Sequence, residues 1–310
     1  MGGGNGGGGS TQDAKHVLDE FGEKVYKEIV GKKPDGTAET YKGELKGNLT
    51  DSSILGERGG TTDTCDLVQK YYTKRLVGNG DPCKGLSAIN VERFSDTLGG
   101  QCTNEKMRSD GIGACAPYRR LHLCHHNLET INNTTSTAKH DLLLEVCMAA
   151  KYEGNSIETP YTIHKHTNND SAAELCTVLA RSFADIGDIV RGRDLFYGNP
   201  QESTQRKQLD KKLKVIFGKI HEGLKDPEKT KYNDPKGNYY LLREDWWTAN
   251  RATIWEALTC HAGQNDKYFR DACSGGKGTN GQCHCIAGEV PTYFDYVPQY
   301  LRWFEEWAED

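Results

Sequence analysis

Cysteine and histidine are the residue types in this sequence with the widest range of chemistry open to them. The chain has 11 cysteines and 10 histidines. Two short stretches, HLCHH at residues 122–126 and CHC at residues 283–285, bring both types together and invite a zinc interpretation. Structural zinc sites usually pair cysteines two to four residues apart and follow them with a similarly spaced second pair. Neither stretch has this pattern, so we predict no metal site.

The cysteines are instead spread along the chain, which is typical of disulfide bonding. The disulfide candidates are Cys65, Cys83, Cys102, Cys115, Cys124, Cys147, Cys176, Cys260, Cys273, Cys283 and Cys285. Their number is odd, so at least one thiol is free, pairs with another chain or pairs with a segment outside this sequence. We favour the last alternative, because the sequence stops inside a predicted helix.

Catalytic patterns are missing from the sequence. No local context marks one thiol as the nucleophile of a cysteine–histidine pair. The glycines at residues 275–278 lack the preceding strand and following helix of a phosphate-binding loop, and there is no Walker pattern. We therefore predict that the chain is not an enzyme and uses no cofactor.

Positive charge is local and not global. The formal net charge is −5, which gives no bulk attraction to nucleic acid. A basic run between residues 206 and 219 is offset only by Asp210 and would suit a sulfated glycan, and arginine suits bidentate contact with sulfate or carboxylate. The candidates for binding a heparin-like glycan are Lys207, Lys211, Lys212, Lys214, Arg119, Arg120, Arg191 and Arg193. The alternatives are a solvated helix face for the lysines and internal pairing with aspartates for the arginines.

Helices must position these residues, because apolar residues recur at helical spacing over much of the chain. One predicted helix begins at Asp13. The others cover residues 139–152, 171–193, 204–224, 243–260 and 298–309. Ser171 and Glu174 match a capping box. Trp246 and Trp247 are adjacent, so we expect only one to face inward and the other to cap a surface groove. As a further hypothesis, Cys176 and Cys260 lie on neighbouring bundle helices and pair.

Turn-rich stretches divide the chain into three parts. Residues 1–63 are predicted to form a flexible glycine-rich start, a helix and a connector. Residues 64–150 form a loop-rich unit held by disulfides, and residues 151–310 form a helical unit in which residues 261–297 are a polar surface loop. No stretch approaches the roughly 20 apolar residues that span a bilayer, and the N-terminus lacks the apolar core of a signal peptide.

Several blocks resemble the Duffy-binding-like domain of alpha class. They are ACAPYRRLHLC at residues 114–124, ARSFADIGDIVRGRDLF at 180–196, DWWTANR at 245–251 and PTYFDYVPQYLRWFEEW at 291–307. VLDEFGEKVY at 17–26 and YKGELKGNL at 41–49 resemble the N-terminal segment that precedes this domain in Plasmodium falciparum erythrocyte membrane protein 1. The resemblance covers nearly all of residues 13–310.

The resemblance implies a mainly α, disulfide-stapled Duffy-binding-like fold with a loop-rich first subdomain and a helix-bundle second subdomain. The chain would stop where a third subdomain begins, leaving Trp303 and Trp307 exposed. The implied role is host-cell adhesion by a variant surface antigen in malaria, through rosetting and cytoadherence. The implied location is the extracellular face of the infected host erythrocyte membrane, with the membrane anchor in a segment downstream.

The partners that the resemblance implies are host-cell receptors, glycans and adjacent adhesin domains. Family-level candidates are heparan sulfate, blood-group sugars and complement receptor 1, on red cells or endothelium. The alternative function is an antigenically variable structural head, which positions neighbouring adhesive domains and binds nothing tightly itself.

Overall fold

The structure is a computed structural model that describes residues 13–31, 42–55, 62–75, 80–84, 114–131, 136–167, 175–198 and 200–309. Three of the sequence-based predictions lie outside these residues. They concern the glycine-rich start, the pairing of Cys102 and the capping box formed by Ser171 and Glu174.

The regular elements in the described part of the chain are helices, which confirms the predicted fold class. They are α1 (Ala14–Gly31), η1 (Leu49–Asp51), α3 (Thr64–Arg75), α4 (Tyr118–Leu121), α5 (His126–Glu129), α6 (Ala138–Thr167), α7 (Leu175–Arg191), α8 (Pro200–Glu222), α9 (Glu228–Lys231), α10 (Tyr240–Leu258), η2 (Phe294–Tyr296) and α11 (Gln299–Glu309). Asp13 caps α1 as predicted, because its Oδ1 accepts a hydrogen bond from the backbone N–H of His16 at 3.1 Å.

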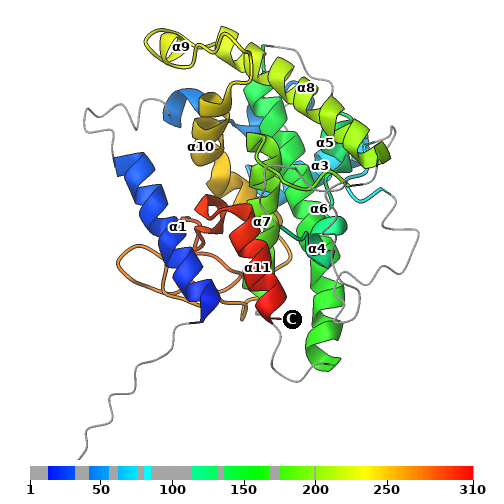
Figure 1. Ribbon diagram of the computed structural model, residues 1–310, viewed down its shortest axis with the longest axis vertical. Coiled ribbons are helices and arrows are strands. Elements are labelled where there is room, and N and C mark those ends of the chain that lie inside the picture. The colour runs from blue at the N-terminus through cyan, green and yellow to red at the C-terminus, as the bar shows by residue number, and fades with distance from the viewer. Residues whose placement is uncertain are drawn as a thin grey trace, which may run out of the picture.

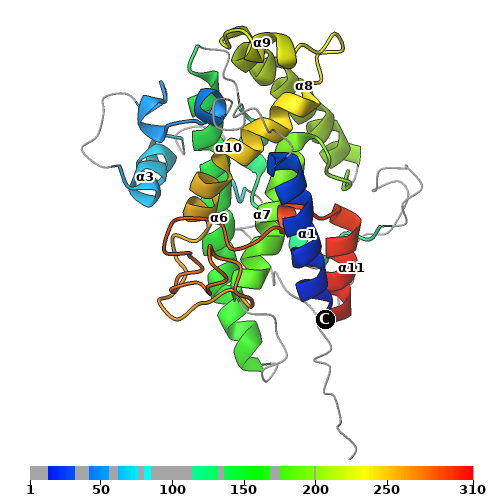
Figure 2. The same ribbon diagram turned by 90° about the vertical axis from the view of Figure 1, so that its left-hand side faces the viewer.

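Three long helices, α6, α7 and α10, pack against one another and form the centre of the molecule (Figure 1). Around them, α8 crosses one end of the bundle, α1 and α11 lie together on one flank and α3 lies on another (Figure 2). Every residue of α7 after its first is buried. A helix enclosed on all sides has no solvent face, so its polar residues need partners inside the protein.

Both adjacent tryptophans of α10 are fully buried, so the prediction that one caps a surface groove is wrong. Trp246 packs edge-on against Phe217 of α8, and Trp247 packs against Phe183 of α7. The indole N–H of Trp247 donates to Asp295 Oδ2 at 2.8 Å. Two different faces of α10 are therefore both covered by neighbouring helices, which a one-sided amphipathic pattern does not anticipate.

The N-terminal segment is packed onto the helical body. Asp19 of α1 is fully buried, and it accepts hydrogen bonds from Thr292 Oγ1 at 2.9 Å and from the backbone N–H of Tyr293 at 2.7 Å. Arg270 Nε donates to its other oxygen. Burial raises the pKa of Asp19, although Arg270 opposes this rise. Because these three groups all bind the Asp19 carboxylate, they fix the position of α1.

The stretch at residues 261–297 is not simply a surface excursion. It contacts α1 through Arg270, and the indole N–H of Trp255 in α10 donates to the carbonyl of Cys283 at 3.0 Å. Tyr268 and Cys283 are buried. The predicted boundary between residues 150 and 151 falls inside α6, which continues to Thr167.

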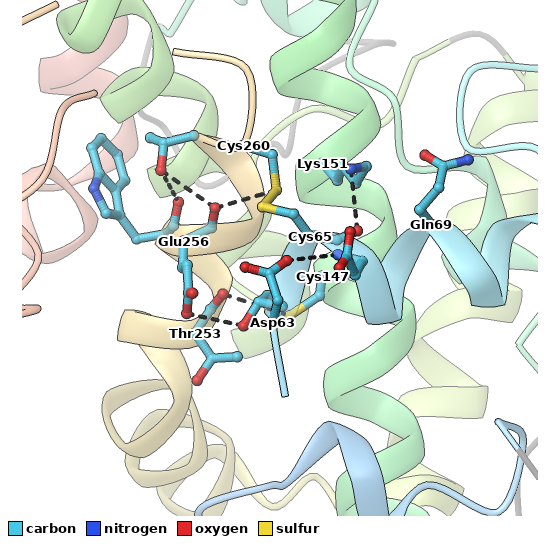
Figure 3. Close-up of a disulfide and its surroundings, with 12 residues drawn as sticks. Asp63, Cys65, Gln69, Cys147, Lys151, Thr253, Glu256 and Cys260 are labelled. Atoms are coloured by element: carbon cyan, nitrogen blue, oxygen red, sulfur yellow. Dashed lines mark hydrogen bonds between the residues drawn. A yellow bond between two sulfur atoms is a disulfide. The ribbon is translucent and has the colours of Figure 1, made fainter. Parts of the chain in front are cut away.

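Four disulfides connect the described cysteines, and they correct the predicted pairing of Cys176 with Cys260. The bonds are Cys65–Cys260, Cys83–Cys124, Cys176–Cys283 and Cys273–Cys285. Cys115 is also disulfide-bonded. In Figure 3 Cys260, just past the end of α10, meets Cys65 at the start of α3.

Contacts around Cys65 account for this pairing. Lys151 Nζ of α6 donates to the carbonyl of Cys65 at 3.2 Å, and Thr64 Oγ1 donates to Glu256 of α10 at 2.9 Å. These bonds hold the first turn of α3 over the end of α10. Cys176 instead forms its disulfide with Cys283 of the 261–297 stretch.

Cys147 of α6 is a free, fully buried thiol. Its Sγ lies 3.8 Å from the carbonyl of Thr253 in α10, close to the Cys65–Cys260 bond (Figure 3). Burial raises the pKa of this thiol well above its usual value. The odd cysteine thus lies in the core as a free thiol, the first of the three alternatives, and a partner outside the sequence stays a prediction.

Candidate functional site

The basic run lies on α8, at one end of the bundle (Figures 1 and 2). The helix is anchored by a buried apolar stripe of Leu209, Leu213, Ile216, Phe217 and Ile220. Lys207 and Lys211 are exposed, and the side chain of Lys214 is 35% exposed. Their spacing of four and three residues places them on one helix face, one turn apart. We call Lys207, Lys211, Lys212 and Lys214 the α8 lysine strip.

Two members of the α8 lysine strip have partners inside the protein. Lys212 Nζ donates to the carbonyl of Glu129 in α5 at 2.7 Å, and Lys214 pairs with Asp210 at 3.0 Å. Burial opposes ionisation of Asp210, but its hydrogen bond to Lys214 and the charge of Arg243 keep its pKa below the usual value. The positive charge of the strip is therefore strongest at Lys207 and Lys211.

Three of the four predicted arginine ligands are buried, so they add no exposed charge to a surface for a glycan chain. Arg119, Arg120 and Arg191 are each at most 2% exposed. Arg191 Nη2 pairs with Asp188 at 2.9 Å, and Arg120 Nη2 pairs with Asp194 at 2.6 Å. These arginines follow the alternative, internal pairing. Only the fourth, Arg193, stays accessible: its side chain is 57% exposed and pairs with Glu244 at 2.7 Å.

Asp185 of α7 is the centre of this buried ionic network. It accepts hydrogen bonds from Arg119 Nη2 at 2.7 Å and from Arg302 Nη2 at 2.8 Å. Burial opposes its ionisation, but the charges of Arg119 and Arg302 hold its pKa well below the usual range. Arg302 and Arg119 also bind Asp188 and Glu306, so the network joins α4, α7 and α11.

The network also corrects the expectation that the last tryptophans are exposed. Trp303 is 1% exposed, and its indole N–H donates to Asp185 Oδ1 at 3.2 Å. Trp307 is half-buried and donates to the carbonyl of Cys115 at 3.2 Å. No sequence signal marked this arrangement, because Asp185 and Asp188 lie on the face of α7 away from its apolar stripe, as the polar residues of a half-exposed helix do. Buried carboxylates on a core helix demand cationic partners.

The two stretches that invited a zinc interpretation have other contacts. Cys124, Cys283 and Cys285 are in disulfides, and His125 and His126 both contact Glu129. In the described ranges no three residues of the metal-ligating types gather as a potential metal site. Likewise, none of the helices described is both long and apolar enough to cross a membrane.

Two family models match the sequence. The Duffy binding domain matches residues 113–302, and the N-terminal segments of PfEMP1, the Plasmodium falciparum erythrocyte membrane protein 1, match residues 13–53. Among curated proteins, the Duffy receptor beta form of Plasmodium knowlesi is 25% identical over 237 residues, which are 74% of this chain and 17% of that protein. The chain thus corresponds to a small part of that relative.

Solved structures of PfEMP1 domains share the fold. The NTS-DBL1-alpha and CIDR-gamma double domain from the Plasmodium falciparum varO strain is 37% identical with a TM-score of 0.73, over 96% of this chain and 43% of that one. A DBL-beta domain of a PfEMP1 bound to human ICAM-1 is 27% identical with a TM-score of 0.67, over 98% of this chain and 63% of that one.

Proposed function

The chain belongs to the Duffy binding domain family and carries a PfEMP1-type N-terminal segment, and from this premise we propose that it is a host-cell adhesion module. It would act within a variant surface antigen on the infected erythrocyte, facing outward. One observation carries the proposal: the chain matches, over 98% of its length, the fold of a PfEMP1 domain bound to human ICAM-1.

The α8 lysine strip is the surface that we propose for an anionic ligand. Lys207 and Lys211 lie one helical turn apart and are exposed, on a helix fixed by a buried apolar stripe, so their charges line one face of α8. A sulfated glycan carries a similar row of negative groups. Heparan sulfate is therefore the ligand class that this surface suits best, before blood-group sugars or complement receptor 1. Arg193 is a secondary candidate.

Binding of the oxidised chain to immobilised heparin across a salt series tests this proposal. The key variant replaces Lys207, Lys211, Lys212 and Lys214 by alanine. The matched control replaces Lys24, Lys46, Lys267 and Lys277, four lysines at exposed positions away from α8, and so makes the same change in net charge. We expect saturable binding that weakens with salt, because ions screen exposed charges beyond about 10 Å at 0.1 M.

Loss of binding in the strip variant but not in the control would support the α8 lysine strip. Equal binding by both variants would remove the strip from the proposal and leave adhesion to another surface. No saturable binding at any salt concentration would favour the alternative, a structural head that positions neighbouring adhesive domains.

A further inference from the structure

A pocket of about 150 Å³ lies where α4, α5 and α8 meet residues 80–84. Its lining is rich in cationic and potentially cationic side chains, namely Lys84, Arg120, His125, His126 and Arg206. Glu129 is the one carboxylate among its lining residues. Leu121, Leu123 and Phe196 add apolar walls, so charges there are less screened than in water.

Two guanidinium groups at this pocket share a single carboxylate. Arg120 pairs with Asp194 at 2.6 Å, and Arg206 Nη1 bonds to the same oxygen of Asp194. Burial, together with the charge of Arg120, lowers the pKa of Arg206 to about 10, even though Asp194 opposes the fall. Glu129 also favours the charged form of Arg206, so more than one carboxylate balances the pair.

Two histidines line the pocket, and one of them, His126, has unused hydrogen-bonding capacity. His125 Nδ1 lies 2.7 Å from the carbonyl of Leu123, which can only accept, so Nδ1 carries the proton. Its Nε2 faces Glu129 Oε1 at 3.3 Å, and only the imidazolium satisfies both contacts. His126 Nδ1 contacts Glu129 Oε2 at 3.0 Å. Its Nε2 is buried with no hydrogen-bond partner in the described structure.

We propose that this pocket binds one oxyanion, a carboxylate or sulfate group. An entering anion is attracted by the cationic lining, in which Lys84, Arg120 and Arg206 outnumber Glu129, and it accepts a hydrogen bond from the protonated Nε2 of His126. The pocket has room for one such group or the acidic end of one sugar, and not for an oligosaccharide. It is separate from the α8 lysine strip, whose residues do not line it. The site therefore does not depend on the proposed adhesion function.

Anion binding at this site should strengthen as the pH falls. Burial, and then the charge of Arg206, lower the pKa of His125, although its hydrogen bond to Glu129 opposes the fall. Of the charged groups around His125, Arg206 and Arg120 oppose its protonation and Glu129 favours it; Lys84 lines the same pocket, and Asp194 binds Arg120. A bound oxyanion shifts this balance toward the imidazolium.

Calorimetric titration of the whole oxidised chain with sodium sulfate, sodium glucuronate and sodium chloride at equal ionic strength tests the proposal. We expect saturable binding of an oxyanion but not of chloride, severalfold tighter at pH 6.0 than at pH 7.5. Stronger binding of sulfate would indicate a sulfated source, and stronger binding of glucuronate an acidic sugar. No saturable oxyanion binding at either pH would overturn the proposal, and equal affinity at both would refute the role given to the histidines.

Gln205→Glu places the test inside the pocket, because Gln205 lines it and glutamate has the same shape. The new carboxylate should act as a built-in anion. We expect it to raise the melting temperature and to weaken oxyanion binding by about tenfold or more, corresponding to about 1.4 kcal/mol. Gln208→Glu, on an exposed position of α8 outside the lining, makes the same charge change and should do neither. Equal effects of the two substitutions would show that the anion binds elsewhere.

Discussion

Asp185 holds two buried arginines at once, so replacing it by asparagine should strongly destabilise the fold. The change keeps the size of the side chain but removes the charge that faces Arg119 at 2.7 Å and Arg302 at 2.8 Å. Breaking one partner of a buried ion pair typically costs about 3–5 kcal/mol. Because Arg119 keeps Glu306 and Arg302 keeps Asp188, we expect the lower end, about 3 kcal/mol.

Denaturant unfolding with the disulfides intact measures this cost. Asp271→Asn, at an exposed position in the 261–297 stretch, is the matched control and should change the free energy of unfolding by less than about 0.5 kcal/mol. A loss below about 1 kcal/mol for Asp185→Asn would refute the reasoning, since it would mean that Arg119 and Arg302 do not depend on this charge.

The pH dependence gives the same prediction a second test. The pKa of Asp185 is lower in the folded protein than the ordinary value of about 3.9, so its stabilisation is fully present above that pH. Stabilisation is then lost as the pH falls below about 4 toward the folded pKa. The difference in stability between wild type and Asp185→Asn should therefore shrink in that range. A difference that stayed constant down to pH 2 would contradict the ionic explanation.

Three further predictions follow from the packing. Gly154→Ala should lower the melting temperature clearly, because the added Cβ would clash with the carbonyl of Leu258; an unchanged melting temperature would contradict the close contact of α6 with α10. Replacing Cys65 and Cys260 together by alanine should cost about 2–5 kcal/mol in unfolding experiments, and a loss under about 1 kcal/mol would argue against this disulfide. Cys147 should resist iodoacetamide until the chain is unfolded, because burial raises its pKa; rapid labelling of the native protein would place it at the surface.

The helices were the most predictable part of the fold. Apolar periodicity located α1, α8, α10 and α11 to within a few residues, because each has at least one face that must be buried. The family resemblance is likewise confirmed by the two matching family models. Periodicity did not show that α10 is covered on more than one face, since this depends on which helices pack around it.

Contacts between distant parts of the chain were not predictable. Arg119 and Arg120 follow a tyrosine in a turn-rich region, and nothing local distinguishes a buried arginine from one that awaits a ligand. The partner of Arg119, Glu306, lies 187 residues further along the chain. The pairing of Cys65 with Cys260, 195 residues apart, is equally non-local. The α8 lysine strip, by contrast, was visible because all its residues lie within two turns of one helix.

Binding to host cells tests the central claim most directly. The measurement is flow cytometry of the labelled, oxidised chain on human red cells and endothelial cells, with the α8 variant lacking Lys207, Lys211, Lys212 and Lys214 beside it. The account predicts saturable binding by the wild-type chain, weakened by salt and greatly reduced in the variant. Failure of the correctly folded wild-type chain to bind either cell type saturably, at any salt concentration, would contradict it.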